Sequence, residues 1–243
     1  VAMFLGIYFN LRKNKDLKLS IKRLRFHMPT VKLIYIVGIP SILMMSIGSV
    51  MTFGMNKILL MFSSTAAAVF GVYFKLQSFF FMPVFGMNNG IVPVIAFNYG
   101  ARNRKRITDS IRLGAIAATV IMLLGVLAFN TVPNVLLGLF NASEEMLTIG
   151  RPALRIISIS YIFAGFSIVI GSVFQALGNG VYSLIVSVCR QLVVLLPCAW
   201  VLAVTLGLHA VWWAFPLAEI ASTVITLVLF RRIYRQKIQP LGT

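Results

Sequence analysis

The chain has 243 residues, of which 59% are hydrophobic and only 11% are charged, and its formal net charge is +17. A soluble domain is typically about 25% charged, so this composition excludes an ordinary water-soluble protein and requires lipid as the solvent for much of its surface. The net charge does not indicate nucleic-acid binding. The basic residues lie at the ends of apolar stretches, where they mark membrane topology and contact anionic headgroups.

The first thirty residues differ from the rest of the chain. Residues 1–9 are apolar but too short to span a bilayer, which takes about 20 residues, and we interpret them as the end of a transmembrane helix that begins upstream. Residues 10–30 form a basic cytoplasmic linker. Within this segment, residues 16–28 alternate apolar and basic side chains, which predicts an amphipathic helix on the inner membrane surface.

Six apolar stretches then follow, each long enough to cross a bilayer as a helix. They cover residues 31–61, 66–97, 107–130, 151–177, 182–206 and 210–231. The predicted fold class is therefore all-α: a polytopic transmembrane helical bundle over residues 31–231, followed by a cytoplasmic tail at 232–243.

Lysine and arginine are concentrated at one end of these spans. Of the 22 Lys and Arg residues, 17 fall within 10–32, 100–112 and 231–243. Alternating crossings place all three segments on one face, which the excess of positive charge identifies as cytoplasmic. We therefore expect a multi-pass protein of the plasma (inner) membrane, with its basic loops and C-terminus in the cytoplasm.

Charged side chains inside a bilayer are costly, so each one is a candidate functional residue. Lys75 and Glu219 both lie about 12–14 Å below the outer surface at 1.5 Å per residue, and we expect them to form a buried pair. The pair is either a static link between two helices or a switch that changes charge with a proton or a substrate. Arg190 lies nearer the cytoplasmic side, where Gln175, Gln191 or a lipid phosphate is the expected partner.

Polar residues recur at helical spacing along several spans. These stripes either pack helices together through small residues and hydrogen bonds or line a cavity, for which flexible Met and aromatic side chains would suit varied apolar cations. The candidate cavity or coupling residues are Asn56, Lys75, Phe79, Met82, Asn89, Gln175, Arg190 and Glu219. The prolines expected to interrupt the spans are Pro40, Pro83, Pro93, Pro197 and Pro216.

The second span and its exit carry a specific resemblance. The run from Pro93 to Arg102, which contains Asn98-Tyr99-Gly100-Ala101, resembles the multidrug and toxic compound extrusion (MATE) family. Further matching segments are Gly38-Ile-Pro40, Phe174 to Gly178, Arg190-Gln191 with Pro197, and Trp212 to Glu219. The resemblance covers the whole chain as the C-terminal half, helices seven to twelve, of a family member.

This resemblance implies one six-helix lobe of a two-lobe transporter, with residues 10–30 as the linker between the lobes. It implies a secondary active antiporter that exports drugs or other small organic cations in exchange for protons or sodium ions. The expected partners are the N-terminal six-helix lobe, the lipid bilayer with its anionic headgroups, and the organic cation. No cofactor is implied apart from the coupling ion, H⁺ or Na⁺.

Three alternatives remain open from the residues alone. A flippase for lipid-linked saccharides, from the same superfamily, is kept open by the cations Lys57, Lys75 and Arg190. A membrane-embedded enzyme would need paired carboxylates, a histidine cluster or a nucleophile with a base, whereas His27 and His209 are predicted on opposite sides of the membrane. A bare scaffold is disfavoured by the polar stripes. We therefore expect no enzymatic activity, no catalytic residues and no metal site.

Overall fold

The computed structural model describes residue 8 and residues 27–241, and every regular element in that part of the chain is a helix. The chain divides into two compact units, residues 1–39 and 40–243. The account below concerns the second unit. The predicted helix end at 1–9 and the linker at 10–30, with its amphipathic helix at 16–28, lie almost wholly outside the described residues, so these boundaries stay predictions.

The first two helices are long and joined by a short turn. Helix α2 runs over Met28–Leu60 and α3 over Ser64–Gly100, 33 and 37 residues respectively. The start of α3 is fixed by Ser63, whose side-chain oxygen accepts a hydrogen bond from the backbone N–H of Ala66 at 3.0 Å. This contact satisfies one of the N–H groups left unpaired at a helix start.

The middle of the chain forms four helices, two of them meeting at a sharp bend. Helix α4 (Arg104–Thr131) is followed by the short α5 (Pro133–Gly138), then by α6 (Glu144–Ser158) and α7 (Tyr161–Ala176). The axes of α6 and α7 differ by 51° across Ile159 and Ser160. The span predicted at 151–177 is therefore broken near its middle.

The last third of the chain contains two further helical runs, and both include π-helical turns. The first run comprises α8 (Gly180–Val188), the π-helical segment η2 (Cys189–Leu195) and α9 (Leu196–Leu206). The second comprises α10 (Leu208–Val211), α11 (Ala214–Ile233) and the π-helical segment η3 (Tyr234–Ile238). The last helix thus continues seven residues beyond its predicted end at 231.

Only some of the expected prolines lie at a helix interruption. Helix α3 continues through Pro83 and Pro93, so the helix does not end at either of these two prolines. Pro216 lies in the first turn of α11, where backbone N–H groups have no partner within the helix, so a proline there costs no helical hydrogen bond. Pro197 directly follows η2 and starts α9. Here the wider turn precedes the proline that would otherwise clash with a carbonyl one turn back.

Four of the predicted spans meet the length and composition needed to cross a membrane, or five if one bent pair of helices counts as a single span. Within the described residues these are α3, α4, the run from α8 to α9 and the run from α10 to η3, together with α6 and α7 if the bent pair is one span. The span predicted at 31–61 lies on α2 and stays a prediction. Large apolar side chains are exposed on these helices, including Phe79, Phe97 and Leu113, as expected where lipid is the solvent.

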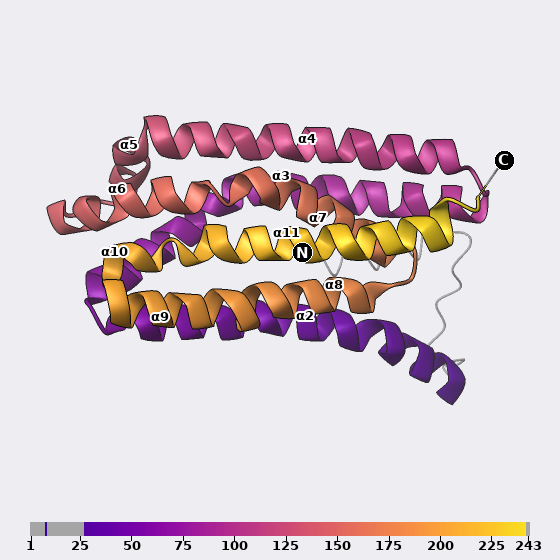
Figure 1. The fold of residues 1–243 in the computed structure, drawn as a ribbon, viewed down its shortest axis with the longest axis horizontal. Helices are drawn as coiled ribbons and strands as arrows, with labels where there is room; N and C mark the ends of the chain where they lie inside the picture. Colours follow the sequence, from indigo (N-terminus) through magenta and orange to yellow (C-terminus); the bar gives the residue numbers. More distant parts are fainter. Residues whose placement is uncertain (1–7, 9–26, 242–243) are drawn as a thin grey trace. The chain divides into compact units, whose positions relative to one another are not determined.

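The helices of the second unit lie side by side, and their connections alternate between two ends (Figure 1). The turns after α3 and α7, and the end of α11, lie at one end of the unit. The turn before α3, the segment from α5 to α6 and the break between α9 and α10 lie at the other. The basic segments 100–112 and 231–241 therefore share an end, as the sequence predicted.

The core of the second unit has two buried clusters. The larger is centred on interlocking rings from three helices: Tyr73, Phe129 and Tyr161, with Phe129 and Tyr161 centroids 5.6 Å apart. The smaller, which includes Ile107, Phe174 and Ile233, joins the ends of α3, α4, α7 and α11 beneath the basic segments. Together the clusters fix these four helices around the site described below.

The close contact of α7 with α4 yields a test of the packing. A Cβ on Gly165 would lie 3.1 Å from the backbone C and O atoms of Ala118, which cannot move as a side chain can. We expect Gly165→Val to reduce stability by about 1–3 kcal/mol through overpacking, seen as a lower thermal unfolding midpoint in detergent. Gly86→Val is the control, because nothing lies within 4 Å of a Cβ there; equal midpoints for the two variants would contradict the packing described.

Candidate functional site

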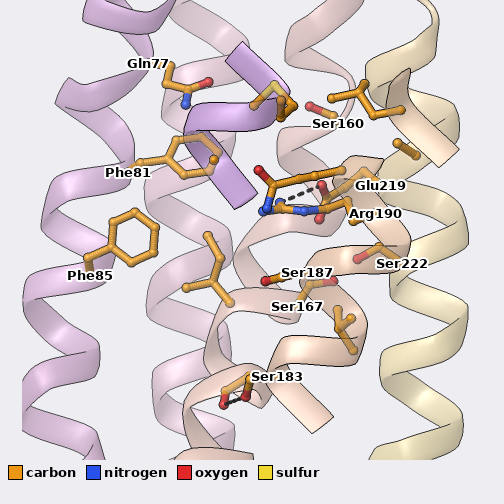
Figure 2. A pocket seen from close by; sticks show the side chains of 18 of the residues that line it. Gln77, Phe81, Phe85, Ser160, Ser167, Ser183, Ser187, Arg190, Glu219 and Ser222 are labelled. Carbon is orange, nitrogen blue, oxygen red and sulfur yellow. Dashed lines mark hydrogen bonds and ion pairs between the residues drawn. The ribbon is translucent and has the colours of Figure 1, made fainter. Parts of the chain in front are cut away.

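A cavity of about 870 Å³ lies among the helices of the second unit. Its walls come from α2, α3, α7, α8, η2 and α11. Aromatic side chains form part of the lining, and Figure 2 shows Phe81 and Phe85 extending from α3 toward the polar side of the pocket. The remainder is rich in amide and hydroxyl groups, including Gln77, Ser183 and Ser222.

One ion pair lies in this pocket. Arg190 of η2 donates from Nη1 to Oε2 of Glu219 on α11, at 3.1 Å. The Glu219 side chain is 7% exposed, whereas that of Arg190 is 31% exposed. The two are the only charged residues that line the pocket, so its net formal charge is zero, and the guanidinium is the more accessible of the two charges.

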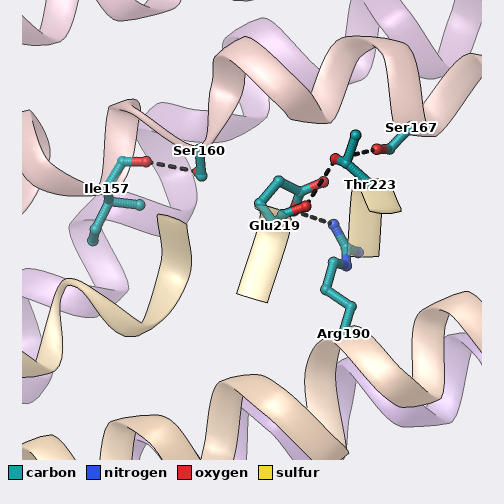
Figure 3. A network of polar contacts seen from close by, with 6 residues as sticks. All are labelled: Ile157, Ser160, Ser167, Arg190, Glu219 and Thr223. Carbon is teal, nitrogen blue, oxygen red and sulfur yellow. Dashed lines mark hydrogen bonds and ion pairs between the residues drawn. The ribbon is translucent and has the colours of Figure 1, made fainter. Parts of the chain in front are cut away.

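Hydroxyl groups from two helices hold Glu219 in place. Thr223 donates from Oγ1 to the backbone carbonyl of Glu219 at 2.8 Å, one turn along α11. Its Oγ1 also lies 3.0 Å from Oγ of Ser167 on α7 (Figure 3). This chain of contacts ties the carboxylate-bearing turn of α11 to α7.

Arg190 reaches Glu219 from an irregular stretch of helix. It is the second residue of the π-helical segment Cys189–Leu195. Single π-helical turns inside α-helices are frequent at functional sites, because the wider turn rotates the following side chains and loosens the local hydrogen bonding. A second irregularity faces the same pocket at the bend before α7, where Ser160 donates to the backbone carbonyl of Ile157 at 2.7 Å.

Several buried polar atoms at the pocket have no hydrogen-bond partner among the described residues. They include Oε1 of Glu219, Oγ of Ser222 and Oδ1 of Asn88. A buried acceptor without a partner carries a desolvation cost of about 1–3 kcal/mol. A proton or a cation brought to Glu219 would remove that cost for its free oxygen, so the carboxylate is poised to gain a second partner.

The structure brings together five of the eight residues predicted for the cavity. Asn56, Asn89, Gln175, Arg190 and Glu219 all line the pocket. Lys75, Phe79 and Met82 do not line it, and all three are exposed. The functional role of each of these eight residues remains a prediction.

The predicted pairing of Lys75 with Glu219 is wrong. Glu219 pairs with Arg190, and the Nζ of Lys75 lies 5.7 Å from the ring centroid of Phe140, which follows α5. The matched depths of Lys75 and Glu219 fixed only their height along the membrane normal. Helix α3 turns Tyr73 and Leu76 inward, which leaves Lys75 on its outer side.

The expectation that Arg190 would find Gln175, Gln191 or a lipid phosphate is also overturned. The depth estimate assumed two uninterrupted α-helices and left an axial gap between Arg190 and Glu219. Both helical runs are irregular, through η2 in one and the break at Trp212 and Trp213 in the other. The altered register and the length of the arginine side chain close that gap.

The predictions missed the face of α3 that lines the pocket. That face carries Gln77, Phe81, Phe85 and Asn88, a spacing of four, four and three residues that follows one side of a helix. The same spacing was available in the sequence. The neighbouring stripe that contains Lys75 is equally periodic, and it was predicted to line the cavity because Lys75 is charged.

These features define a class of protein: a polytopic α-helical membrane protein whose helices enclose a polar and aromatic pocket around one buried ion pair. Residues 40–201 match the family model MatE. Because this match covers more than half of the chain, the chain belongs to the MatE family of multidrug and toxic compound extrusion proteins. The family resemblance drawn from the residues is confirmed.

Individual relatives agree with this assignment. The chain is 26% identical over 228 residues to the multidrug export protein MepA of Staphylococcus haemolyticus, covering 94% of the chain and 50% of the relative. A solved structure titled as the outward-facing conformation of a multidrug resistance MATE family transporter aligns with a TM-score of 0.85 at 22% identity, over 99% of the chain and 53% of that structure. Its inward-facing counterpart aligns with a TM-score of 0.83 at 20% identity, over 99% of the chain and 56% of that structure.

The chain thus spans about half the length of the relatives it matches. The solved structures support the fold, which is all-α as predicted. This extent agrees with the expectation that the chain corresponds to one of two lobes.

The ion pair yields a test by double substitution. Removing one member of a buried pair costs about 3–5 kcal/mol, and we expect Arg190→Met to fall near the lower end, because 31% of the arginine side chain is exposed. Arg190→Met/Glu219→Met should recover most of that loss, since neither charge is then left unpaired. Thermal unfolding in detergent measures both variants, and a loss in the double variant that equals or exceeds that of Arg190→Met would contradict this interaction.

Proposed function

We propose that this chain forms one lobe of a secondary active antiporter that exports drugs or other small organic cations. Membership of the MatE family supports this proposal, as does the similarity to a protein named as a multidrug exporter. The observation that carries it is the buried carboxylate of Glu219 in a pocket of about 870 Å³ that also has aromatic walls.

The lining of the pocket suits an organic cation. Phe53, Phe74, Phe81, Phe85 and Phe215 contribute aromatic surface, and a cation over an aromatic ring gains about 0.5–2 kcal/mol. Glu219 supplies the negative charge. Arg190 occupies that carboxylate in this structure, and a bound cation would take its place.

Competition between a proton and an organic cation for Glu219 would couple the binding of one to the release of the other. When Glu219 is ionised, its charge and that of Arg190 cancel, so the pocket can accept an organic cation. When Glu219 binds a proton, Arg190 is uncompensated and repels a cation; two like charges 4 Å apart interact by about 4 kcal/mol at an effective dielectric of 20. Protonation from one side would therefore eject the cation, and deprotonation would restore the pocket.

The remaining partners follow from the same proposal. A second six-helix lobe would close the pocket from the other side, and the bilayer with its anionic headgroups would surround both lobes. Sodium is the alternative coupling ion. The relatives' names do not favour a saccharide flippase, and the proposed role is transport rather than an enzymatic reaction.

The coupling role of Glu219 can be tested in the complete gene product that contains this chain. Glu219→Gln keeps the shape of the side chain but cannot change its charge. We expect efflux of a cationic dye such as ethidium to fall at least tenfold and to lose its dependence on external pH. Dye efflux and drug susceptibility, measured over a range of pH and of sodium concentration, check this result.

Glu144→Gln is the matched control, because Glu144 is an exposed carboxylate in the first turn of α6, outside the pocket. It should leave efflux unchanged. Unchanged efflux in Glu219→Gln at every pH would remove Glu219 from coupling. An efflux that follows sodium rather than pH would assign the coupling ion to Na⁺.

The proposed orientation in the cell membrane has its own test. In a background where Cys189 and Cys198 are replaced by alanine, we expect a membrane-impermeant maleimide to label Glu144→Cys in intact cells and to label Lys105→Cys only after lysis. Lys105 lies in the first turn of α4 and Glu144 in the first turn of α6, and both residues are exposed. The starts of these two helices lie at opposite ends of the unit (Figure 1). The reverse pattern would place the basic end outside the cell.

A further inference from the structure

A second, smaller pocket lies at the basic end of the bundle, and it shares no lining residue with the pocket of the ion pair. It has a volume of about 330 Å³ and is lined by Arg104, Phe230, Arg231, Tyr234, Arg235 and Gln239. These residues come from the first turn of α4, the last turn of α11, the π-helical segment η3 and the residue that follows it. The pocket thus joins two helices where they leave the apolar part of the bundle.

One of the three guanidinium groups in this pocket is held in a fixed position. Arg104 donates from Nη2 to the hydroxyl of Tyr234 at 3.3 Å and from Nη1 to the backbone carbonyl of Gln239 at 3.5 Å. Its Cζ lies 5.8 Å from the centroid of the Tyr234 ring. The guanidinium is therefore oriented before any ligand binds, which reduces the entropy lost on binding.

The other two arginines lie one helical turn apart on the same side. Arg231 and Arg235 are both exposed, four residues apart across the junction of α11 with η3. No carboxylate lines the pocket, and the one ion pair within the described part of the chain is that of Arg190 with Glu219. Three positive groups therefore converge on one small pocket without a negative partner from the described residues.

The chemistry of these groups selects the ligand. Guanidinium groups bind phosphate oxygens through paired N–H donors. Three guanidinium groups around one pocket therefore favour a phosphate group, with one or two negative charges, as the ligand. Phe230 and Tyr234 add an aromatic wall. The pocket therefore suits a phosphate ester with an apolar portion.

An apolar stripe leads from the arginines along the same face of α11. Ile220, Val224 and Val228 are 44%, 56% and 61% exposed, and they precede Arg231 and Arg235 at spacings of three and four residues, which follow one side of a helix. Acyl chains could lie along this stripe while the phosphate stays among the arginines. A free phosphate would make no use of it.

We infer that this pocket binds the phosphate headgroup of an anionic phospholipid, with the acyl chains along the exposed face of α11. Basic pockets between transmembrane helices at the cytoplasmic side are suited to such headgroups. Bound there, the lipid links the start of α4 to the end of α11. Lys237, which donates to the carbonyl of Leu177 at 2.7 Å, ties the same segment to the end of α7.

The test measures lipid binding to the purified complete gene product in detergent, by native mass spectrometry and by thermal shift. Phosphatidylglycerol should bind and raise the unfolding midpoint, and phosphatidylcholine should not. At about 1 kcal/mol for each hydrogen bond to the phosphate that is lost, or about fivefold in affinity, Arg231→Gln/Arg235→Gln should weaken phosphatidylglycerol binding by roughly 25-fold.

The matched control is Arg102→Gln/Arg232→Gln, which removes the same charge from two exposed arginines near the pocket that do not line it. It should change the affinity by less than about threefold. Equal losses of affinity in the two double variants would show that phosphatidylglycerol responds only to the total surface charge, which would overturn the proposal.

Two further measurements separate the remaining explanations. Arg231→Lys/Arg235→Lys keeps the charge but loses the paired donors, so its affinity should fall between those of the wild type and the glutamine variant. An affinity equal to that of the wild type would show that the paired N–H donors of the two arginines do not contribute to binding. Inorganic phosphate and glycerol 3-phosphate at millimolar concentration should not displace the lipid, and displacement by either would identify a soluble phosphate site instead. None of these readouts depends on transport activity.

Discussion

The carboxylate of Glu219 is the constraint on which the pocket depends. An ionised carboxylate withdrawn from water needs a partner of opposite charge, because removing the partner of a buried charge costs about 3–5 kcal/mol. Arg190 meets that need from a neighbouring helical run, and Thr223 and Ser167 fix the turn that carries Glu219. One oxygen of the carboxylate is left without a partner among the described residues. The hydrogen-bonding capacity of the carboxylate is therefore satisfied only in part.

Two of the helix interruptions lie at this site. In lipid every backbone N–H and C=O group must be satisfied within the protein, so irregular helix is tolerated only where it is buried or lines a cavity. The π-helical segment η2 carries Arg190, and the bend before α7 places Ser160 at the same pocket. Helix α3, in contrast, continues through two prolines. Prolines were therefore only a partial guide to the interruptions, since Pro197 directly follows η2.

Arginine has two different roles in this chain, and its environment decides between them. In the pocket, Arg190 is compensated by one carboxylate, so the site is neutral and responds to any change in the charge of Glu219. At the basic end, Arg104, Arg231 and Arg235 surround a pocket with no carboxylate in its lining. We propose that these guanidinium groups bind an anion. The first arrangement suits exchange within the bundle, and the second suits attachment to the membrane surface.

The sequence by itself determined the membrane class, the order of the helices and the end at which the basic segments gather. These properties follow from the free energy of transfer into lipid, which is read residue by residue along the chain. The Asn98–Ala101 motif carried the resemblance to the family, which the family model confirms. The sequence also placed Arg190 and Glu219 among the charged residues inside the spans, although the depths estimated from it left an axial gap between two residues that lie 3.1 Å apart. The rotation of each helix was not readable, because Lys75, Phe79 and Met82 form as regular a stripe as Gln77, Phe81 and Phe85. Only the tertiary structure decided which stripe faces the pocket and that Arg190, rather than Lys75, meets Glu219, because that outcome depends on how neighbouring helices pack and where their regular turns are interrupted.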